Sequence, residues 1–210
     1  TSDALAGIAP DEVVDPRPYA EILRQWSTLH PEFAFLPRKF KIAITGARED
    51  RVALGWHDIG LKLVRNDAGE VGFEVHVGGG MGRTPLVATP ARAFVPWHQI
   101  LVYLEAIVRV YNRYGRRDNA FKARLKILVK AEGQRLFDAV DAEFAKILNR
   151  DADGDAQLIT EAELERVAAH FADPSGVRPA RGGFEPARHL DAPLGFTRWL
   201  ARNVHAHRVS

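Results

Sequence analysis

The chain has 210 residues, of which 46% are hydrophobic and 27% charged, and its formal net charge is +2. This composition predicts a folded globular protein, and the small net charge predicts affinity for neither nucleic acid nor membranes. The sequence contains no cysteine, which excludes disulfides, thiol catalysis and metal or iron–sulfur sites ligated by cysteines of this chain. No apolar run approaches the roughly 18 residues that span a bilayer, and the N-terminus has no signal-peptide pattern, so we expect a cytoplasmic protein.

The first half of the chain predicts a short helix followed by strands. Apolar residues with helical spacing are Tyr19, Ile22, Leu23 and Trp26. Between Pro37 and Gly80 the apolar period changes to two, in the stretches RKFKIAITG, DIGLKLVRN and GEVGFEVHVGGG. Turn-forming residues 66–69 join the last two stretches. We predict a three-stranded antiparallel unit, with residues 51–56 as a connection or a further short strand, followed by a loop that contains prolines.

The second half of the chain predicts helices. Residues 96–115 have a strong helical pattern that begins at Pro96 and ends at Gly115. Further helices are expected over about residues 118–131, 134–148 and 160–171, before a linker with proline and glycine at 173–193. Strands first and helices afterwards predict the α+β class, with an antiparallel sheet packed with helices.

Two lysines lie two positions apart in the first predicted strand, LPRKFKIAITG at residues 36–46. Successive strand side chains point to opposite faces, so Lys39 and Lys41 share one face while Phe40 and Ile42 share the other. Like charges about 7 Å apart repel each other unless an anion or a carboxylate lies between them. The pattern therefore indicates either an anion site or solvated lysines on an exposed strand.

Three consecutive glycines end the last predicted strand, in VGGGMGRT at residues 77–84. Gly78, Gly79 and Gly80 would let backbone amides approach a phosphate, a carboxylate or a flat macrocycle closely. A flexible turn explains the same residues. The stretch is neither a Walker loop nor a dinucleotide-binding GxGxxG motif.

A basic run follows in RYGRRDNAFKARLK, residues 113–126. It could bind nucleic-acid phosphates or the carboxylates of an anionic cofactor, or it could be a solvated helix face, and it contains no base-reading motif. Arg124 and Lys126 are two positions apart, so on a helix they are not expected to face the same way.

The acidic stretch DADGDAQLITEAEL, residues 151–164, resembles a calcium-binding loop. Ala156 stands where that loop needs a turn glycine, and the last acidic ligand falls one residue late. We expect an acidic loop between helices instead, with Thr160 as the N-cap and Glu163 completing a capping box. No residue is assigned to a metal.

Three separated stretches together carry a family resemblance: LPRKFKIAITG, GFEVHVGGGMGRT and NAFKARLKILV. They occur in this order in the sirohaem-dependent sulfite and nitrite reductases. The chain resembles the sirohaem-binding middle portion of the haemoprotein (beta) subunit of assimilatory sulfite reductase. The resemblance covers residues 28–130 well and residues 135–190 poorly. It implies the six-electron reduction of sulfite to sulfide at sirohaem coupled to a 4Fe–4S cluster.

The resemblance also implies roles for individual residues. Lys39 and Lys41 would hold the anionic substrate, stabilise the negative charge that develops on it and supply protons. Sirohaem carries several carboxylates, which suits arginine and lysine donors. The implied sirohaem contacts are Gly78, Gly79, Gly80, Arg83, Asn119, Arg124 and Lys126.

The family holds its cluster with four cysteines, whereas this chain has none. We therefore expect a fragment of a longer polypeptide that carries both cofactors, and we expect the isolated chain to be inactive and free of cofactor. The expected organisation is an arm and short helix at residues 1–28, a sirohaem- and substrate-binding α+β domain at 29–175 with an acidic helical insertion at about 135–172, and a linker leading into a truncated domain at 176–210. The expected partners are sulfite and an electron donor, either a flavoprotein reductase or ferredoxin.

Two alternatives stay open at this point. A sirohaem nitrite reductase, which reduces nitrite to ammonia, shares these motifs and this chemistry. A non-enzymatic module that binds anions or RNA through the basic run would also explain the cationic residues.

Overall fold

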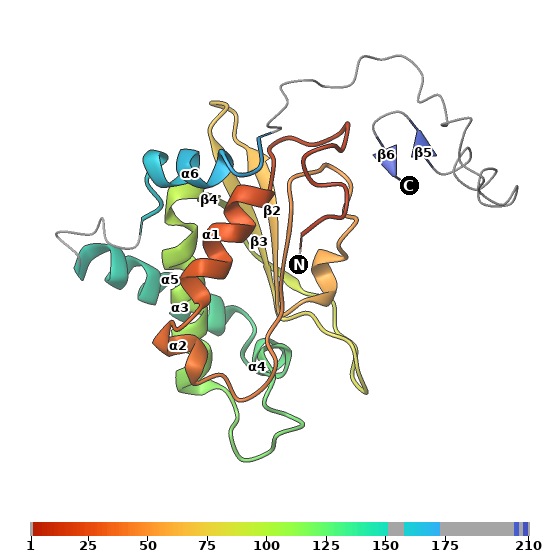
Figure 1. Cartoon of the computed structure of the whole chain (residues 1–210). Coiled ribbons are helices and arrows are strands. Elements are labelled where there is room, and N and C mark those ends of the chain that lie inside the picture. Colours follow the sequence, from red (N-terminus) through yellow and green to blue (C-terminus); the bar gives the residue numbers. More distant parts are fainter. Residues whose placement is uncertain (1, 151–157, 173–203, 206–207, 210) are drawn as a thin grey trace, which may run out of the picture. The chain divides into compact units, whose positions relative to one another are not determined.

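The computed structural model describes residues 2–150, 158–172, 204–205 and 208–209, and the chain divides into two units, Thr1–His170 and Phe171–Ser210. The described part of the second unit is an antiparallel pair of short strands, β5 (Val204–His205) and β6 (Arg208–Val209). All other elements belong to the first unit (Figure 1). Among the described helices, none combines the length and the apolar character that crossing a membrane requires.

A four-stranded mixed sheet is the central element of the first unit. Its strands lie in the order β1 (Ile42–Thr45), β2 (Ile59–Arg65), β3 (Val71–Val77) and β4 (Thr89–Pro96). The predicted hairpin of β2 and β3 is confirmed, and Asn66 Oδ1 closes its turn by accepting the amides of Ala68 and Glu70 at 3.0 and 2.9 Å. Alternate residues of the two central strands are buried: Ile59, Leu61, Leu63, Phe73, Val75 and Val77. One face of the sheet therefore lies in the core, as the period of two predicts.

The pairing of β1 with β2 is parallel, where the sequence led us to expect an antiparallel neighbour. Residues 46–58 connect the two strands and include the short 3₁₀ helix η1 (Leu54–Trp56). A connection of about a dozen residues is long enough to cross over and return in the same direction, which a tight hairpin cannot do. The α+β class is confirmed, with a mixed sheet.

Strand β4 occupies a stretch that the sequence suggested would be a loop, because Pro90 and Pro96 lie within it. Its position explains how the prolines are tolerated. β4 is the edge of the sheet, and its register with β3 shifts between Phe73 and Val75 and again between Val75 and His76. Proline is compatible with edge strands and irregular pairing because it has no amide hydrogen to donate.

The helices gather on one side of the sheet (Figure 1). They are α1 (Arg17–Ser27), α2 (Pro31–Ala34), α3 (Ile100–Tyr114), α4 (Leu125–Glu132), α5 (Gln134–Arg150) and α6 (Glu161–Ala168). Helix α3 begins at Ile100, after the 3₁₀ helix η2 (Trp97–Gln99), and not at Pro96 as predicted, because Pro96 is the last residue of β4. It ends before Gly115, as predicted. The ring of Tyr19 in α1 meets Phe73 of β3 edge-on, with 5.5 Å between the centroids.

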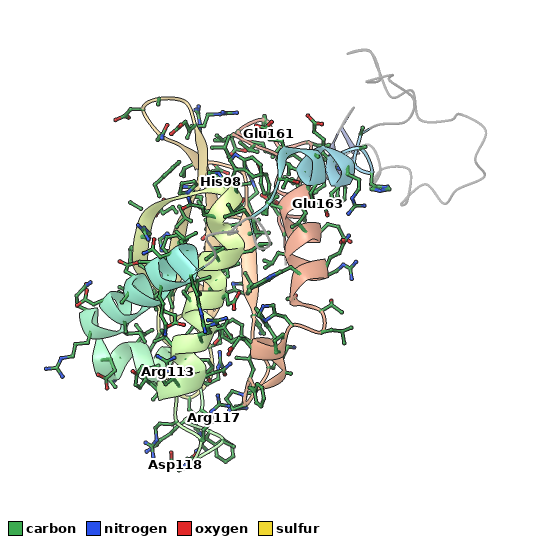
Figure 2. The ribbon with its side chains drawn as sticks, turned by 90° about the vertical axis from the view of Figure 1, so that its left-hand side faces the viewer. His98, Arg113, Arg117, Asp118, Glu161 and Glu163 are labelled. Atoms are coloured by element: carbon green, nitrogen blue, oxygen red, sulfur yellow. The ribbon has the colours of Figure 1, made fainter. Side chains whose placement is uncertain are left out.

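The helix predicted from residue 118 begins only at Leu125. Residues 115–124 form a loop in which side chains bond some of the backbone groups, and such bonds compete with helix formation. Asn119 Oδ1 accepts the amide of Phe121 at 2.9 Å, and Arg38 Nη1 donates to the carbonyl of Ala120 at 3.0 Å. Figure 2 shows Arg117 and Asp118 at one end of the first unit, beyond α3.

Candidate functional site

Four segments meet at one end of the sheet. They are the stretch before β1 (residues 36–41, called the lysine segment), the residues before β2, the glycines after β3 (Gly78–Gly80, called the glycine run), and the start of α4. The strand register explains this meeting, because Ile42 pairs with Ile59 and Ile59 pairs with Val77. The ends of these strands therefore lie side by side.

Both ammonium groups of the lysine segment face solvent. Strand β1 begins at Ile42, so Lys39 and Lys41 lie in the extended chain just before it rather than within it. Phe40 turns the other way and packs near Phe33 and Tyr111, with ring centroids 6.4 and 6.2 Å apart. Among the described residues, the Nζ atoms of Lys39 and Lys41 have no hydrogen-bond or ion-pair partner.

The glycine run requires glycine for two different reasons. Gly78 has a φ of +91°, which favours glycine, and its amide donates to the carbonyl of Asp58 at 2.9 Å. A Cβ atom on Gly79 would overlap the carbonyl oxygen of Gly55 and lie 2.6 Å from that of His57. The backbone of the run is thus pressed against residues 55–58, and no larger side chain fits between them.

Lys126 holds the loop that follows the glycine run. Its side chain is buried, and Nζ donates to the carbonyls of Gly80, Met81 and Thr84 at 3.3, 2.9 and 2.6 Å. Burial lowers the pKa of Lys126, the charge of Arg124 lowers it further and that of Asp58 raises it. All three ammonium hydrogens have acceptors within the protein, so here the lysine fixes the shape of the loop.

Arg124 reaches the same place because it is not helical. It is the N-cap of α4, with extended backbone angles of −133° and 142°, which points its side chain toward the glycine run beside Lys126. A Cβ atom on Gly80 would lie 2.9 Å from Arg124 Nη2 and 3.2 Å from Lys126 Cδ. The sequence-based argument that these two side chains diverge assumed a helix at residue 124, and it is wrong for that reason.

Asp58 is a central residue of this cluster that the sequence analysis did not single out. Its side chain is buried, with 1% of its surface exposed. Oδ1 accepts Nε and Nη2 of Arg124 at 3.2 and 2.9 Å, and Oδ2 accepts the backbone amide of Lys41 at 3.0 Å. The feature of the sequence that could have pointed to Asp58 is its position as a single carboxylate directly before the apolar strand IGLKLV.

Arg83 and Asn119 lie further out. Arg83 is exposed in the loop held by Lys126, and it has no hydrogen-bond or ion-pair partner among the described residues. Asn119 is half-buried in the loop before α4, where its carbonyl also accepts the amide of Lys122 at 2.9 Å. Arg38 links the lysine segment to this loop through Ala120.

Most of the basic run is engaged in contacts within the chain. Arg116 pairs with Asp118, and Arg117 donates to the carbonyl of Phe35 at 2.6 Å. Arg113 lies 3.8 Å from Glu143 of α5. These contacts leave few of the run's cations free, so they count against its use as a continuous phosphate-binding stripe.

Residues 1–147 match the family described as the nitrite and sulphite reductase 4Fe-4S domain. The chain belongs to this family. Sulfite reductase (ferredoxin) 1 of Mycolicibacterium paratuberculosis is 37% identical over 133 residues, which cover 63% of this chain and 24% of the relative. Sulfite reductase (ferredoxin) of Synechococcus elongatus is 42% identical over 123 residues, which cover 54% of this chain and 20% of the relative.

Two further similarities bear on substrate and fold. The chloroplastic ferredoxin–nitrite reductase of Arabidopsis thaliana is 32% identical over 134 residues, covering 61% of this chain and 23% of the relative. The structure of Mycobacterium tuberculosis NirA protein superposes with a TM-score of 0.61 at 35% identity, covering 69% of this chain and 26% of that one. This chain thus spans about a quarter of the length of the curated relatives.

The nitrite and sulphite reductase family implies sirohaem, a flat macrocycle with a rim of carboxylates, and the chemistry of this end of the sheet suits such a group. Cationic groups without a partner in the described chain lie on the lysine segment and at Arg83. Apolar side chains are exposed on the neighbouring loops at Trp56, Met81 and Val87, by 55%, 58% and 73%. Apolar surface beside free cations fits an anionic macrocycle better than a small ion alone.

The family's iron–sulfur cluster does not fit this chain in the same way. The sequence has no cysteine that could ligate it. Among the described residues, no group of three or more histidines and carboxylates could hold a metal ion either. The first half of the calcium-like stretch, residues 151–157, lies outside the described residues. Thr160 does cap α6, with Oγ1 accepting the amide of Glu163 at 3.2 Å, whereas the Glu163 carboxylate pairs with Arg166.

Proposed function

We propose that this chain provides the sirohaem- and substrate-binding part of a ferredoxin-dependent sulfite reductase. The observation that carries the proposal is the pair of lysines without partners beside the glycine run, at one end of one sheet. Membership of the nitrite and sulphite reductase family makes sirohaem the group expected at this end. The names of the similar proteins favour ferredoxin over a flavoprotein as the electron donor.

Lys39 and Lys41 would bind sulfite and support its reduction. When bound, sirohaem would supply the redox-active iron that this chemistry needs. The ammonium groups would place positive charge beside the bound anion, and each Nζ could donate a proton to an oxygen of the anion, which leaves as water. Phe40 lies between the two lysines and packs near Phe33 and Tyr111, and this packing would hold the backbone of the lysine segment in place.

The remaining assigned residues would hold the macrocycle. The glycine run lets the backbone come close to a flat ring, and Arg83, Asn119 and Arg124 offer donors to its carboxylates. Lys126 would act by keeping the loop after the glycine run in shape, since Nζ already donates to three carbonyls. The cluster ligands must come from outside this chain, so we expect the isolated chain not to reduce sulfite.

The test replaces both lysines in the full-length polypeptide. With reduced methyl viologen as donor, Lys39→Ala/Lys41→Ala should lower kcat/KM for sulfite by about 100-fold or more, the size of effect found when donors to a developing anion are removed. The visible haem bands should be retained. Lys130→Ala is the matched control, because Lys130 is an exposed lysine on α4 and has no partner among the described residues.

The outcome that refutes the proposal is an unchanged kcat/KM in the double variant at normal sirohaem content. A polypeptide without haem bands would refute the cofactor assignment as well.

Nitrite is the second candidate substrate, because the similarity to a plant nitrite reductase covers 61% of this chain, close to the 63% covered by a sulfite reductase. Running the same assay with nitrite separates the two. A sulfite reductase should show the higher kcat/KM with sulfite, and the lysine pair should matter for whichever anion is physiological.

A further inference from the structure

The buried carboxylate of Asp58 joins two segments that have separate tasks in the proposed function. One oxygen binds the guanidinium of Arg124 and the other binds the backbone amide of Lys41. The carbonyl of the same residue accepts the amide of Gly78. A single residue is thus bonded to the lysine segment, to the glycine run and to the start of α4.

The position of Asp58 makes these bonds rigid. The residue directly precedes β2, and only 1% of its side-chain surface is exposed. Its neighbour Ile59 is completely buried and pairs with Ile42, the first residue of β1. Hydrogen bonds in such a dry place are stronger than the same bonds in water.

We propose that Asp58 is a positioning residue that sets the placement of Lys41 relative to Arg124, and through them the placement of the substrate relative to the macrocycle. This inference rests on the proposed function. The carboxylate is buried and bonded to the amide of Lys41, so its effect on the substrate would pass through the backbone of the lysine segment. Replacing it should therefore impair the action of the lysine pair rather than add a separate defect.

A double-mutant cycle in the full-length protein tests this dependence, with rates expressed per bound sirohaem. Asp58→Asn keeps the shape of the side chain, but its amide group can accept on one side only. It should lower kcat/KM for sulfite by about tenfold in the otherwise unchanged protein, and by less than about twofold in the Lys39→Ala/Lys41→Ala protein. A residue that merely stabilises the fold would give equal losses in both backgrounds.

Hydrogen exchange of the same protein gives a second readout that does not depend on activity. Asp58→Asn should speed amide exchange in peptides covering residues 37–45 and 78–84, because the amides of Lys41 and Gly78 lose or loosen their acceptor. Asp50→Asn is the matched control, since Asp50 also accepts a backbone amide nearby, that of Leu54 at 2.9 Å, without contacting the lysine segment. If the Asp58→Asn protein does not fold, Asp58→Glu takes its place in both experiments, because it keeps the charge but displaces the acceptor of the Lys41 amide.

Equal losses in the two backgrounds, or unchanged exchange at residues 37–45, would overturn the inference while leaving the lysine assignment intact. Unimpaired sulfite reduction in the lysine-pair protein would instead overturn the proposed function, and this inference with it.

Discussion

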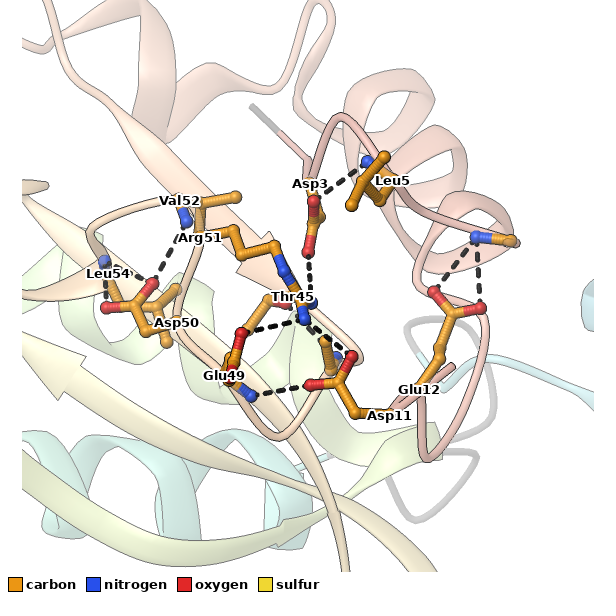
Figure 3. Close-up of polar contacts among 12 residues, drawn as sticks. Asp3, Leu5, Asp11, Glu12, Thr45, Glu49, Asp50, Arg51, Val52 and Leu54 are labelled. Atoms are coloured by element: carbon orange, nitrogen blue, oxygen red, sulfur yellow. Dashed lines mark hydrogen bonds and ion pairs between the residues drawn. The ribbon is translucent and has the colours of Figure 1, made fainter. Parts of the chain in front are cut away.

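Asp11 and Arg51 fasten the N-terminal arm to the body of the first unit. Asp11 Oδ1 accepts Arg51 Nη2 at 2.7 Å, and Oδ2 accepts the amide of Glu49 at 2.9 Å (Figure 3). Arg51 also lies 3.5 Å from the buried carboxylate of Asp3. These contacts cross some 40 residues of sequence, so they belong to the folded state and not to the local chain.

The Asp11 contacts predict an acid-dependent loss of stability. The amide of Glu49 and the guanidinium of Arg51 lower the pKa of Asp11 from 3.8 to about 2. Because the folded-state pKa is the lower one, the carboxylate stabilises the fold above pH 3.8, and this contribution is lost as the pH falls toward 2. Thermal unfolding followed between pH 5 and pH 2 should show a smaller acid-dependent decrease for Asp11→Asn than for the unchanged protein.

The control for this measurement is Asp67→Asn. Asp67 is exposed in the turn between β2 and β3 and has no hydrogen-bond partner among the described residues. Its replacement should leave the pH dependence unchanged. Parallel curves for Asp11→Asn and the unchanged protein would show that the arm contacts do not contribute as described.

At the level of single residues, alternation along the lysine segment predicts that Lys39 and Lys41 share a face opposite Phe40. In the structure both lysines are exposed, while Phe40 is half-buried near two aromatic rings. The partners of Arg124 could not be predicted in this way. Asp58 lies 66 residues earlier in the chain, and only the pairing of β1, β2 and β3 brings it beside the start of α4.

Among the elements, α4 matters to the site mainly through its first turn. Arg124 occupies the N-cap position and Lys126 lies in the first turn, and both side chains approach the glycine run. Val129, one turn further on, packs where a Cβ atom of Gly78 would be. The helix and the loop after β3 therefore form one structural unit although the sequence separates them by some 40 residues.

Lys126→Met should loosen this unit. The substitution keeps the apolar stem but leaves the carbonyls of Gly80, Met81 and Thr84 without their donor, so we expect a loss of about 2–4 kcal/mol in the free energy of unfolding. Urea unfolding measures the loss, and faster amide exchange at residues 80–88 would locate it.

Lys130→Met, on the exposed part of the same helix, is the matched substitution and should cost well under about 1 kcal/mol. Equal stability of the two variants would mean that the hydrogen bonds of Lys126 contribute nothing net.

Two elements were mispredicted because tertiary contacts outweighed local pattern. The prolines of residues 89–96 suggested a loop, yet an edge position next to β3 accommodates them in a strand. Residues 118–124 had helical spacing, yet bonds from Arg38 and within the loop hold their backbone in a non-helical form. A short window of sequence around either element identifies neither β3 as the partner of residues 89–96 nor Arg38 as a contact of the loop.

Over the whole molecule, α5 is an integral part of the first unit. Five apolar side chains of this helix are buried: Leu136, Phe137, Val140, Phe144 and Ile147. Phe144 meets Tyr103 of α3 edge-on at 5.2 Å. Arg109 of α3 joins the same interface, at 3.3 Å from Glu143 and 2.5 Å from Glu105.

The family match extends through residue 147, almost to the end of α5. The expected boundaries of an insertion at about residues 135–172 remain a prediction, and these contacts argue for starting it after α5.

The division into two units predicts how truncation affects stability. A chain ending at His170 retains the first unit, so its thermal midpoint should lie within about 3 °C of that of the 210-residue chain. A chain ending at Arg150 should unfold several degrees lower, because it lacks the buried side chains of Ile159 and Val167 and the bond from the Ile159 amide to the carbonyl of His98.

Figure 2 shows Glu161 and Glu163 on α6 and His98 near it, at the end of the first unit opposite Arg117. The truncations therefore act far from the loop before α4. Equal midpoints for the two shortened chains would show that α6 adds no stability to the unit, and a large loss for the chain ending at His170 would contradict the division at that point.

The sequence by itself determined the class of the fold, the hairpin of β2 and β3, the buried face of the sheet, and the family to which three short stretches pointed. Each of these depends on periodicity or on residues close together in the chain. Only the tertiary structure decided that β1 runs parallel to β2, that β4 forms an edge strand of the sheet, and that Asp58 bridges Lys41 and Arg124. Those features depend on which distant segments pack together, because burial and charge pairing outweigh the weak preferences of any one segment.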